Sequence, residues 1–378
     1  MYRLLITGLK EVVQITERSD VDFLKGADMS KMKVLNDPER RLSVLVSSEG
    51  TVAAVGNEEE VRQLLGKKSV ERTMATNGGI LLPGFVDGHS HPVFAGDRVH
   101  EFAMKLAGAT YMEMLRVLAK VDDETPLEVS ATFCGAHAVP KGSSEDQHVR
   151  LICDEMLPAI EKARAAGGLK NLENIDAFCE KNVIGVANTR KVLQAGEKIG
   201  LAANFHAEEL SCIGGAEMGA EIGARAMSHL EEISDAGIRA MAEAGTTAVL
   251  LPSTAFILRL SPPPARKMIE SGVIVALGSD FNPNAYCLSM PMIMHLACVY
   301  MRLSMEEALV AATLNAAHSL GRGRTHGAIS VGRRADFVLL HDDVSSWKHI
   351  IYRMAAQDTV ISSVVKAGRV VHCAADKS

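Results

Sequence analysis

Short apolar runs alternate with helix-like stretches over much of the chain. From residue 82 to about 325, runs rich in Val, Ile, Leu and Ala end in polar residues. We predict strands at residues 82–87, 128–134, 174–179, 201–206, 224–229, 247–251 and 273–279. Strands that are covered on both faces are almost continuously apolar, so this pattern favours a parallel sheet between helices.

Amphipathic stretches typical of helices lie between these strands. They include residues 154–166, 188–199, 234–244 and 265–271. Alternating strands and helices indicate an α/β fold, and we predict a TIM-like (β/α)8 barrel in which seven of the eight strands can be recognised. Functional groups of such a barrel gather at the carboxyl ends of its strands.

The two ends of the chain have a different pattern. Short β-like runs such as 42–46 and 51–55 occur before the barrel, and similar runs at 336–340 and 360–365 follow it. We therefore predict a small β-sandwich domain built from both termini, residues 1–80 plus 327–378. The metal-dependent hydrolase barrel is then expected at residues 81–326.

His89 and His91 follow the strand predicted at 82–87. Residues i and i+2 of an extended strand point to the same side. Both imidazoles are therefore expected to project together, as half of a metal site.

Further polar side chains stand at or just beyond other predicted strand ends, namely His137, His206, His229 and Asp280. A single histidine in such a place is more often structural than functional. Three imidazoles and one carboxylate together suit a divalent ion that keeps one position open for water. A bound water ionises near neutral pH, and Glu209, three residues beyond His206, is placed to move its proton. His229 can stabilise a developing oxyanion or share the proton transfer.

Composition excludes several classes of protein. The net charge of −6, without a basic block, argues against nucleic-acid binding. No apolar run reaches the ~18 residues of a membrane span, and the amino terminus lacks a signal-peptide pattern. The seven scattered cysteines form no Cys-x-x-Cys pair, which indicates reduced thiols. We expect a cytoplasmic enzyme with a small-molecule substrate and neither a nucleic-acid nor a membrane partner.

The order His89-x-His91, His206-x-x-Glu209, His229 and Asp280 resembles the mononuclear branch of the amidohydrolase superfamily. Longer strings at 89–98 (HSHPVFAGDR), 135–140 (GAHAVP) and 279–283 (SDFNP) resemble the imidazolonepropionase family within it. The resemblance extends from about residue 82 to the carboxyl terminus.

That resemblance implies hydrolysis of 4-imidazolone-5-propanoate to N-formimidoyl-L-glutamate, in histidine degradation, by attack of a metal-bound hydroxide. It implies one zinc or iron ion per subunit. The implied metal ligands are His89, His91, His206 and Asp280, and the implied catalytic residues are Glu209, His229 and Asp280. The implied substrate-binding residues are Arg98, Tyr111, His137, Glu209, Asn282 and Asn284.

Two of these residues are ambiguous on their own. Arg98 can grip a propanoate carboxylate through two hydrogen bonds, although without its surrounding string a solvated loop arginine is the better interpretation. His137 can equally be a packed histidine at a strand end. A homodimer is expected because cyclic dimers are the commonest oligomers.

One strand–helix unit is missing from the predicted barrel. Only 45 residues separate His91 from His137, and they supply one helix and one strand. A βα unit takes roughly 30 residues or more, and the resemblance implies a second strand between Tyr111 and Glu128. The sequence can be a splice form or an imperfect gene model, which we favour, or a true variant that lost the unit. Loss of a strand breaks the closure of a barrel, so the activity of this chain is in doubt.

Two other functions compete with the imidazolone hydrolase. A guanine- or cytosine-type nucleobase deaminase of the same superfamily would carry the same His206-x-x-Glu209 pair with His229. A non-catalytic scaffold or inactive isoform would explain the missing unit. Retention of every expected metal ligand argues against the scaffold.

Overall fold

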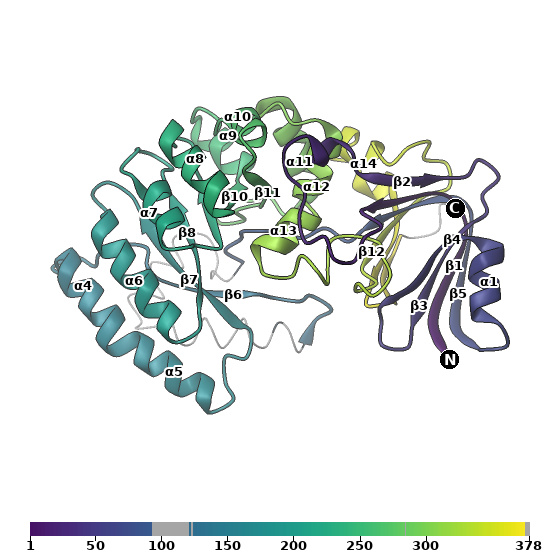
Figure 1. Ribbon diagram of the computed structural model, residues 1–378, viewed down its shortest axis with the longest axis horizontal. Helices are drawn as coiled ribbons and strands as arrows, with labels where there is room; N and C mark the ends of the chain where they lie inside the picture. The colour runs from purple at the N-terminus through teal and green to yellow at the C-terminus, as the bar shows by residue number, and fades with distance from the viewer. Residues whose placement is uncertain (93–120, 122–123, 284, 375–378) are drawn as a thin grey trace. The chain divides into compact units, whose positions relative to one another are not determined.

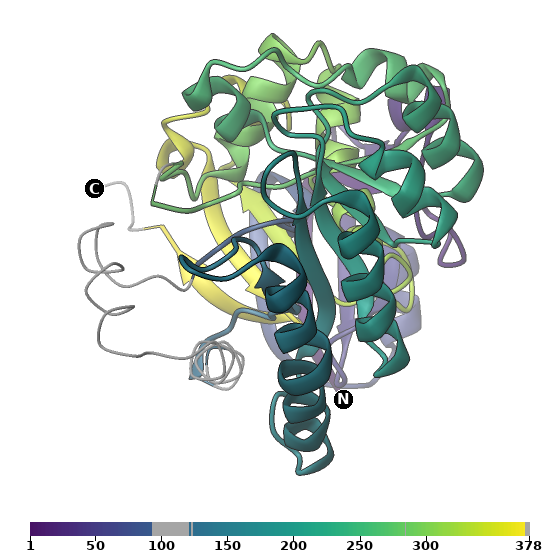
Figure 2. The ribbon, with the colours of Figure 1, turned by 90° about the vertical axis from the view of Figure 1, so that its left-hand side faces the viewer.

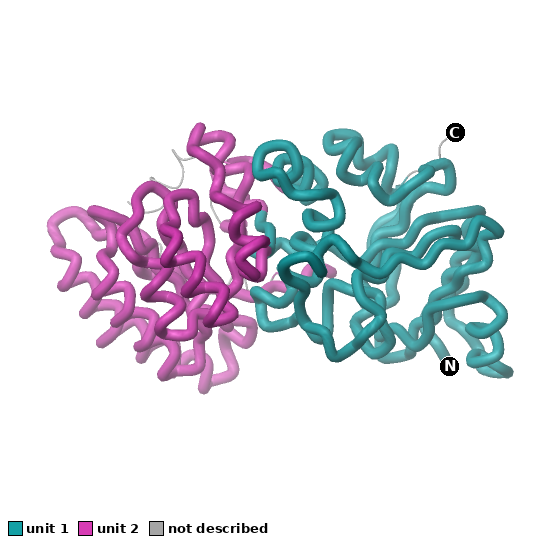
Figure 3. Tube along the Cα trace, turned by 45° about the horizontal axis from the view of Figure 1, so that its top comes forward, with its two compact units in different colours: residues 1–88, 276–278, 289–378 teal, residues 89–275, 279–288 magenta. Residues whose placement is uncertain are grey.

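The computed structural model describes residues 1–92, 121, 124–283 and 285–374, which form two compact units (Figure 3). The first unit contains residues 1–88, 276–278 and 289–378. The second contains residues 89–275 and 279–288.

A sheet of eight strands organises the first unit. From one edge to the other the order is β14 (Arg369–Cys373), β13 (Ile361–Lys366), β12 (Phe337–Leu340), β5 (Val70–Pro83), β1 (Tyr2–Ile15), β3 (Leu42–Ser47) and β4 (Val52–Asn57), with β2 (Lys33–Asn36) paired to β1. Strand β5 runs parallel to β1 and antiparallel to β12. Strands from both ends of the chain therefore share one sheet.

The helices of the first unit are α1 (Glu58–Leu65), α11 (Met290–Tyr300), α12 (Met305–Ala311), α13 (Leu314–Ser319) and α14 (His349–Tyr352), with short 3-10 turns η1 (Gly26–Ser30) and η3 (Gln357–Thr359). Apolar side chains of β1, β3, β5 and β12 form its core, among them the fully buried Leu4, Val44 and Phe337. A capping box of Ser304 and Glu307 starts α12.

Most of a six-stranded sheet lies in the second unit, and Figure 1 labels its strands β6, β7, β8, β10 and β11. Its strands follow chain order: β6 (Ala131–Ala136), β7 (Leu172–Cys179), β8 (Ala202–Ala207), β9 (Ala226–His229), β10 (Thr247–Leu250) and β11 (Ile274–Leu277). Neighbouring strands from β6 to β10 are parallel. These elements confirm six of the seven predicted strands.

The helices of the second unit connect these strands. In the part of the chain that the structure describes, they are α4 (Glu145–Leu151), α5 (Leu157–Ala165), α6 (Val186–Lys198), α7 (Gly215–Glu221), α8 (Asp235–Ala244), α9 (Pro252–Leu258) and α10 (Ala265–Glu270). A π-helical stretch, η2 (Ile152–Met156), joins α4 to α5, and the three run on as one rod (Figure 2). In the described part of the chain, no helix combines the length and apolarity that crossing a membrane requires.

The strand predicted at 82–87 is wrong as a barrel strand. Its first two residues end β5, and the backbone from Gly84 to Gly88 forms no strand. The apolar run is explained by β5, whose last residues are buried between β1 and β12. Beyond β5 the chain still approaches β11, since the Gly88 N–H donates to the Leu277 carbonyl at 3.1 Å.

Two glycines let helices approach the strands of the second unit closely. A Cβ at Gly196 of α6 would lie 2.4 Å from the Ile175 Cδ1 of β7. A Cβ at Gly219 of α7 would lie 2.5 Å from the Met227 Sδ of β9. Helix α6 packs against β7 and β8 (Figure 1). Glycine at these two contacts therefore lets each helix lie closer to its strand than a larger residue would allow.

Gly196→Ala is expected to destabilise the protein by about 1–3 kcal/mol, because the added methyl group overpacks the contact with Ile175. Helix propensity alone favours alanine over glycine by about 1 kcal/mol, so the sign of the change separates the two effects. Chemical denaturation measures it, with Glu197→Ala at the neighbouring exposed position as control. A gain in stability would contradict close packing of α6 on β7.

Candidate metal centre

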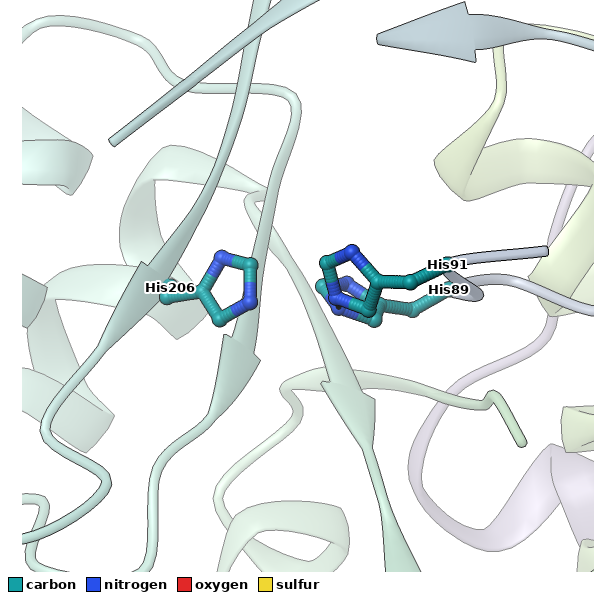
Figure 4. A group of neighbouring side chains, drawn as sticks. All are labelled: His89, His91 and His206. Atoms are coloured by element: carbon teal, nitrogen blue, oxygen red, sulfur yellow. Dashed lines mark hydrogen bonds between the residues drawn. The ribbon is translucent and has the colours of Figure 1, made fainter. Parts of the chain in front are cut away.

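Three histidines and one aspartate converge in the second unit. The Nε2 atoms of His89 and His91 lie 3.0 Å apart. The Asp280 Oδ1 lies 3.6 Å from the first nitrogen and 3.3 Å from the second. His206 faces this pair (Figure 4), and one nitrogen from each of the three imidazoles lies within 4.8 Å of the others.

Different parts of the second unit supply these side chains. His206 lies near the carboxyl end of β8, whereas Asp280 follows β11. Backbone hydrogen bonds join the histidine segment to the turn after β11. The Asp280 N–H donates to the His89 carbonyl at 2.8 Å, and the His91 N–H donates to the Phe281 carbonyl at 2.9 Å. The two histidines project together, as predicted, although they do not lie on a strand.

Left-handed backbone conformations mark this edge of the sheet. Asp280, His229 and Glu208 have φ values of 47°, 78° and 54°. Such conformations cost about 1–3 kcal/mol for residues other than glycine, and they concentrate at functional sites. The Glu208 carboxylate accepts the N–H groups of Gly214 and Gly215, both at 2.9 Å, and so anchors the turn after β8.

The donor set fits a divalent ion. Ligand atoms about 2.0–2.1 Å from a tetrahedral zinc are separated by about 3.3 Å, close to the spacing of the His89, His91 and Asp280 atoms. Burial, together with neighbouring His206 and His91, lowers the pKa of His89 well below its usual value and keeps that imidazole neutral. Burial opposes ionisation of Asp280, but the histidines outweigh it and hold its pKa far below the usual range. Neutral imidazole and ionised carboxylate are the forms that bind a metal.

The side chains of His206, His89 and Asp280 also form hydrogen bonds with residues outside the cluster. His206 Nδ1 lies 3.0 Å from an Asp176 oxygen, and His89 Nδ1 lies 2.9 Å from the Ser228 hydroxyl. The Thr254 hydroxyl donates to the second oxygen of Asp280. Such partners orient metal ligands and set the tautomer of an imidazole.

Sequence reasoning missed these three partners. One signal was present, because Asp176 is a charged residue in the interior of a buried strand. Ser228 and Thr254 have no comparable signal, since buried hydroxyl residues are common in strands and helices.

Two carboxylates flank the His229 ring. Its Nε2 lies 3.6 Å from Glu209, and its Nδ1 lies 3.7 Å from the buried Glu231. Burial opposes protonation of His229, but Glu231 and Glu209 outweigh it and raise its pKa to about 9. Burial raises the pKa of Glu209. A protonated imidazole beside a carboxyl group of raised pKa is suited to general acid–base chemistry.

The predicted substrate-binding residues have different outcomes. His137 stacks on Phe178 at a centroid distance of 5.3 Å and lies 5.4 Å from the His206 ring. The Asn282 amide donates to the Asp280 carbonyl at 2.7 Å, which helps to shape the turn after β11. Three further residues, Arg98, Tyr111 and Asn284, lie outside the described residues.

The amidohydrolase family model matches residues 107–371. A probable imidazolonepropionase of Nematostella vectensis is 44% identical over 429 positions, covering 98% of this chain and 99% of the relative. The probable imidazolonepropionase of Xenopus tropicalis is 42% identical over 428 positions, which cover 98% of this chain and 97% of the relative. The human relative, also named probable imidazolonepropionase, is 41% identical, and the alignment covers 98% of this chain and 99% of the relative.

The alignments are longer than the chain itself. For the Nematostella relative, 429 aligned positions against 378 residues leave at least 51 positions without a counterpart here. Because the alignment covers almost all of both sequences, the unmatched positions are mainly gaps between aligned segments of this chain.

Solved structures share the fold at low sequence identity. A zinc-bound adenosine deaminase from Xanthomonas campestris superposes with a TM-score of 0.71 at 19% identity, covering 100% of this chain and 95% of that one. Guanine deaminase of E. coli gives a TM-score of 0.71 at 15% identity, with 99% of both chains covered. These likenesses and the parallel sheet with its helices support a TIM-barrel-like fold, and the amidohydrolase family match makes it that of a hydrolase.

His137 is expected to titrate near pH 4 in the metal-free protein, since burial and the neighbouring His206 lower its pKa to about 4. It is then neutral over the physiological range and can donate or accept a hydrogen bond. An NMR titration of the histidine ring protons, assigned with His137→Gln, measures this value. A midpoint near the usual 6.5 would contradict the position of the ring beside Phe178 and His206.

Proposed function

Because the chain belongs to the amidohydrolase family, we propose that it is a metal-dependent hydrolase that opens the cyclic amide of 4-imidazolone-5-propanoate. The product is N-formimidoyl-L-glutamate, and the reaction is a step of histidine degradation. The observation that carries this proposal is the near-complete alignment, at 40–44% identity, with relatives named probable imidazolonepropionase. The cluster of His89, His91 and His206 supports the proposal, because such a hydrolase needs a metal site.

His89, His91, His206 and Asp280 are proposed to hold one metal ion. The spacing of the His89 and His91 nitrogens from each other and from Asp280 supports this assignment. When bound, the ion supplies Lewis acidity and an activated water at neutral pH. Imidazole and carboxylate ligands accept zinc or iron, so the donor set is compatible with either.

Glu209 and His229 are proposed to move protons at the reacting centre. Glu209 is mostly buried and has a raised pKa, which suits a group that takes a proton from water and returns it to the leaving nitrogen. His229 is held between Glu209 and Glu231 and can donate to the oxygen that becomes negative as the amide is attacked. Asp280 is ionised and can accept a hydrogen bond from the same water.

Substrate contacts are proposed for Arg98, Tyr111, His137, Glu209, Asn282 and Asn284. His137 lies beside His206, which supports a position next to the reacting centre. The guanidinium of Arg98 is suited to bidentate binding of the propanoate carboxylate. These contacts distinguish an imidazolone propanoate from an uncharged nucleobase.

We also propose that the chain lacks one strand–helix unit of the intact barrel. The 51 or more unmatched positions exceed the roughly 30 residues of a βα unit. Among the described residues, β6 is an edge strand of the six-stranded sheet. The segment that precedes it in the sequence is the short connection from His91. Both observations support a loss before β6.

The wider organisation is proposed from the sequence. Residues 1–80 and 327–378 would form a composite β-sandwich domain, and residues 81–326 would form a barrel. The shared sheet of β1, β5 and β12 supports the composite origin of the smaller domain. A cytoplasmic location and a homodimer complete the proposal.

With metal supplied, the protein is expected to hydrolyse 4-imidazolone-5-propanoate and to leave guanine and cytosine unchanged. The deaminase alternative rests on the shared His206-x-x-Glu209 pair and on solved neighbours that are only 15–19% identical. Ultraviolet absorbance follows loss of each ring compound, and ammonia release reports deamination. Turnover of a nucleobase without turnover of the imidazolone would reject the proposed substrate.

Glu209→Gln is expected to lower kcat by about 10²–10⁴-fold, because the side-chain amide of glutamine cannot take up a proton from water. Metal content is expected to stay at the wild-type value, since Glu209 is not a proposed ligand. Steady-state kinetics and elemental analysis measure the two effects. The exposed Glu232→Gln is the matched control and should retain activity. Wild-type kcat in Glu209→Gln would exclude its role.

Genomic DNA between the codons of Met114 and Leu115 is expected to encode about 50 residues that this sequence omits. Restoring them should raise kcat and the melting temperature, since a closed sheet has no unpaired edge. Continuous coding sequence at this point, with full activity of the 378-residue chain, would contradict the proposed loss.

A further inference from the structure

We propose that Asp176 is a positioning residue that locks His206 in the tautomer and orientation needed to bind metal. The inference rests on the proposed metal site and adds a residue that takes no part in it directly. Asp176 contacts neither His89 nor His91 through a hydrogen bond of the described structure, and acts through His206.

The geometry of two adjacent strands places Asp176 behind His206. Strands β7 and β8 are parallel, and Phe178 pairs with His206 in their register. Asp176 lies two residues before Phe178, and so on the same face of β7. Its side chain reaches the neighbouring strand, and both residues are almost completely buried, at 3% exposed.

Asp176 holds both the backbone and the ring of His206. One carboxylate oxygen accepts the His206 backbone N–H at 3.1 Å and lies 3.0 Å from the ring Nδ1. The second oxygen lies 2.9 Å from the same Nδ1. Two attachments fix the position of the residue and the rotation of its ring together.

This arrangement decides which ring nitrogen can bind an ion. A neutral imidazole has one N–H, and a carboxylate can only accept a hydrogen bond. The proton therefore lies on Nδ1, and the lone pair of Nε2 is free. His206 faces His89 and His91 (Figure 4), so Nε2 is the nitrogen available to the cluster.

Cys134 offers a rival interpretation of the same carboxylate. Its Sγ, an Asp176 oxygen and a His206 nitrogen lie within 4.8 Å of one another, so the three could ligate an ion themselves. An ion bound through His206 Nδ1 would have to displace the hydrogen bond between this nitrogen and Asp176.

Zinc affinity of the full chain, measured by chelator competition, tests the inference. Asp176→Asn is expected to bind zinc about 10–100-fold more weakly than the wild type, as for other partners of ligating histidines. Cys134→Ser is the matched control and should bind within about twofold of the wild type, because it leaves the His206 partner intact. Melting temperatures of the metal-free proteins show whether each variant folds.

Nitrogen-15 NMR of histidine-labelled wild-type protein gives a second measurement that needs no folded variant at Asp176. The metal-free wild type is expected to show His206, assigned with His206→Gln, protonated at Nδ1 and unprotonated at Nε2. Protonation at Nε2 instead would overturn the inference.

The outcomes separate the two proposals. Failure of the wild type to bind zinc would reject the metal site itself. Tight zinc binding by both the wild type and Asp176→Asn would reject only the positioning role. An equal loss in Cys134→Ser and Asp176→Asn would place the ion at the Cys134 group and also overturn the inference.

Discussion

Convergence of buried imidazoles and carboxylates at one edge of a parallel sheet is the constraint on which the rest of the structure depends. Burying several ionisable groups is costly unless each has a partner. Here the ring nitrogens of His89 and His206 that face away from the cluster are paired with Ser228 and Asp176. The nitrogens that remain face one another, which is favourable when a cation lies between them.

The surrounding fold provides for this cluster in two ways. Glycines in α6 and α7 let these helices pack closely against β7 and β9, and this close packing fixes the positions of the strands. Strained backbone occurs at Asp280, just beyond β11, and at His229, the last residue of β9. Such conformations persist only where the surroundings determine them, and they direct side chains that an ordinary strand end would leave pointing elsewhere.

The strand-end rule predicted much of this site from the sequence. His89, His91, His206 and Asp280 come together in the structure, and His229 lies beside Glu209. The rule could not find Ser228 or Thr254, because a hydroxyl behind a ligand has no characteristic spacing. The strand predicted at 82–87 was wrong for a related reason. Its first two residues belong to β5, whose pairing with β12 joins distant parts of the chain and leaves no local pattern.

The coordination shell of a bound ion tests the central claim most directly. X-ray absorption at the zinc edge of the loaded protein should show three imidazole nitrogens at about 2.0–2.1 Å, with the remaining ligands oxygen. Three nitrogens and no sulfur would support a centre built from His89, His91, His206 and Asp280. A sulfur neighbour at about 2.3 Å, or fewer than three imidazoles, would contradict it.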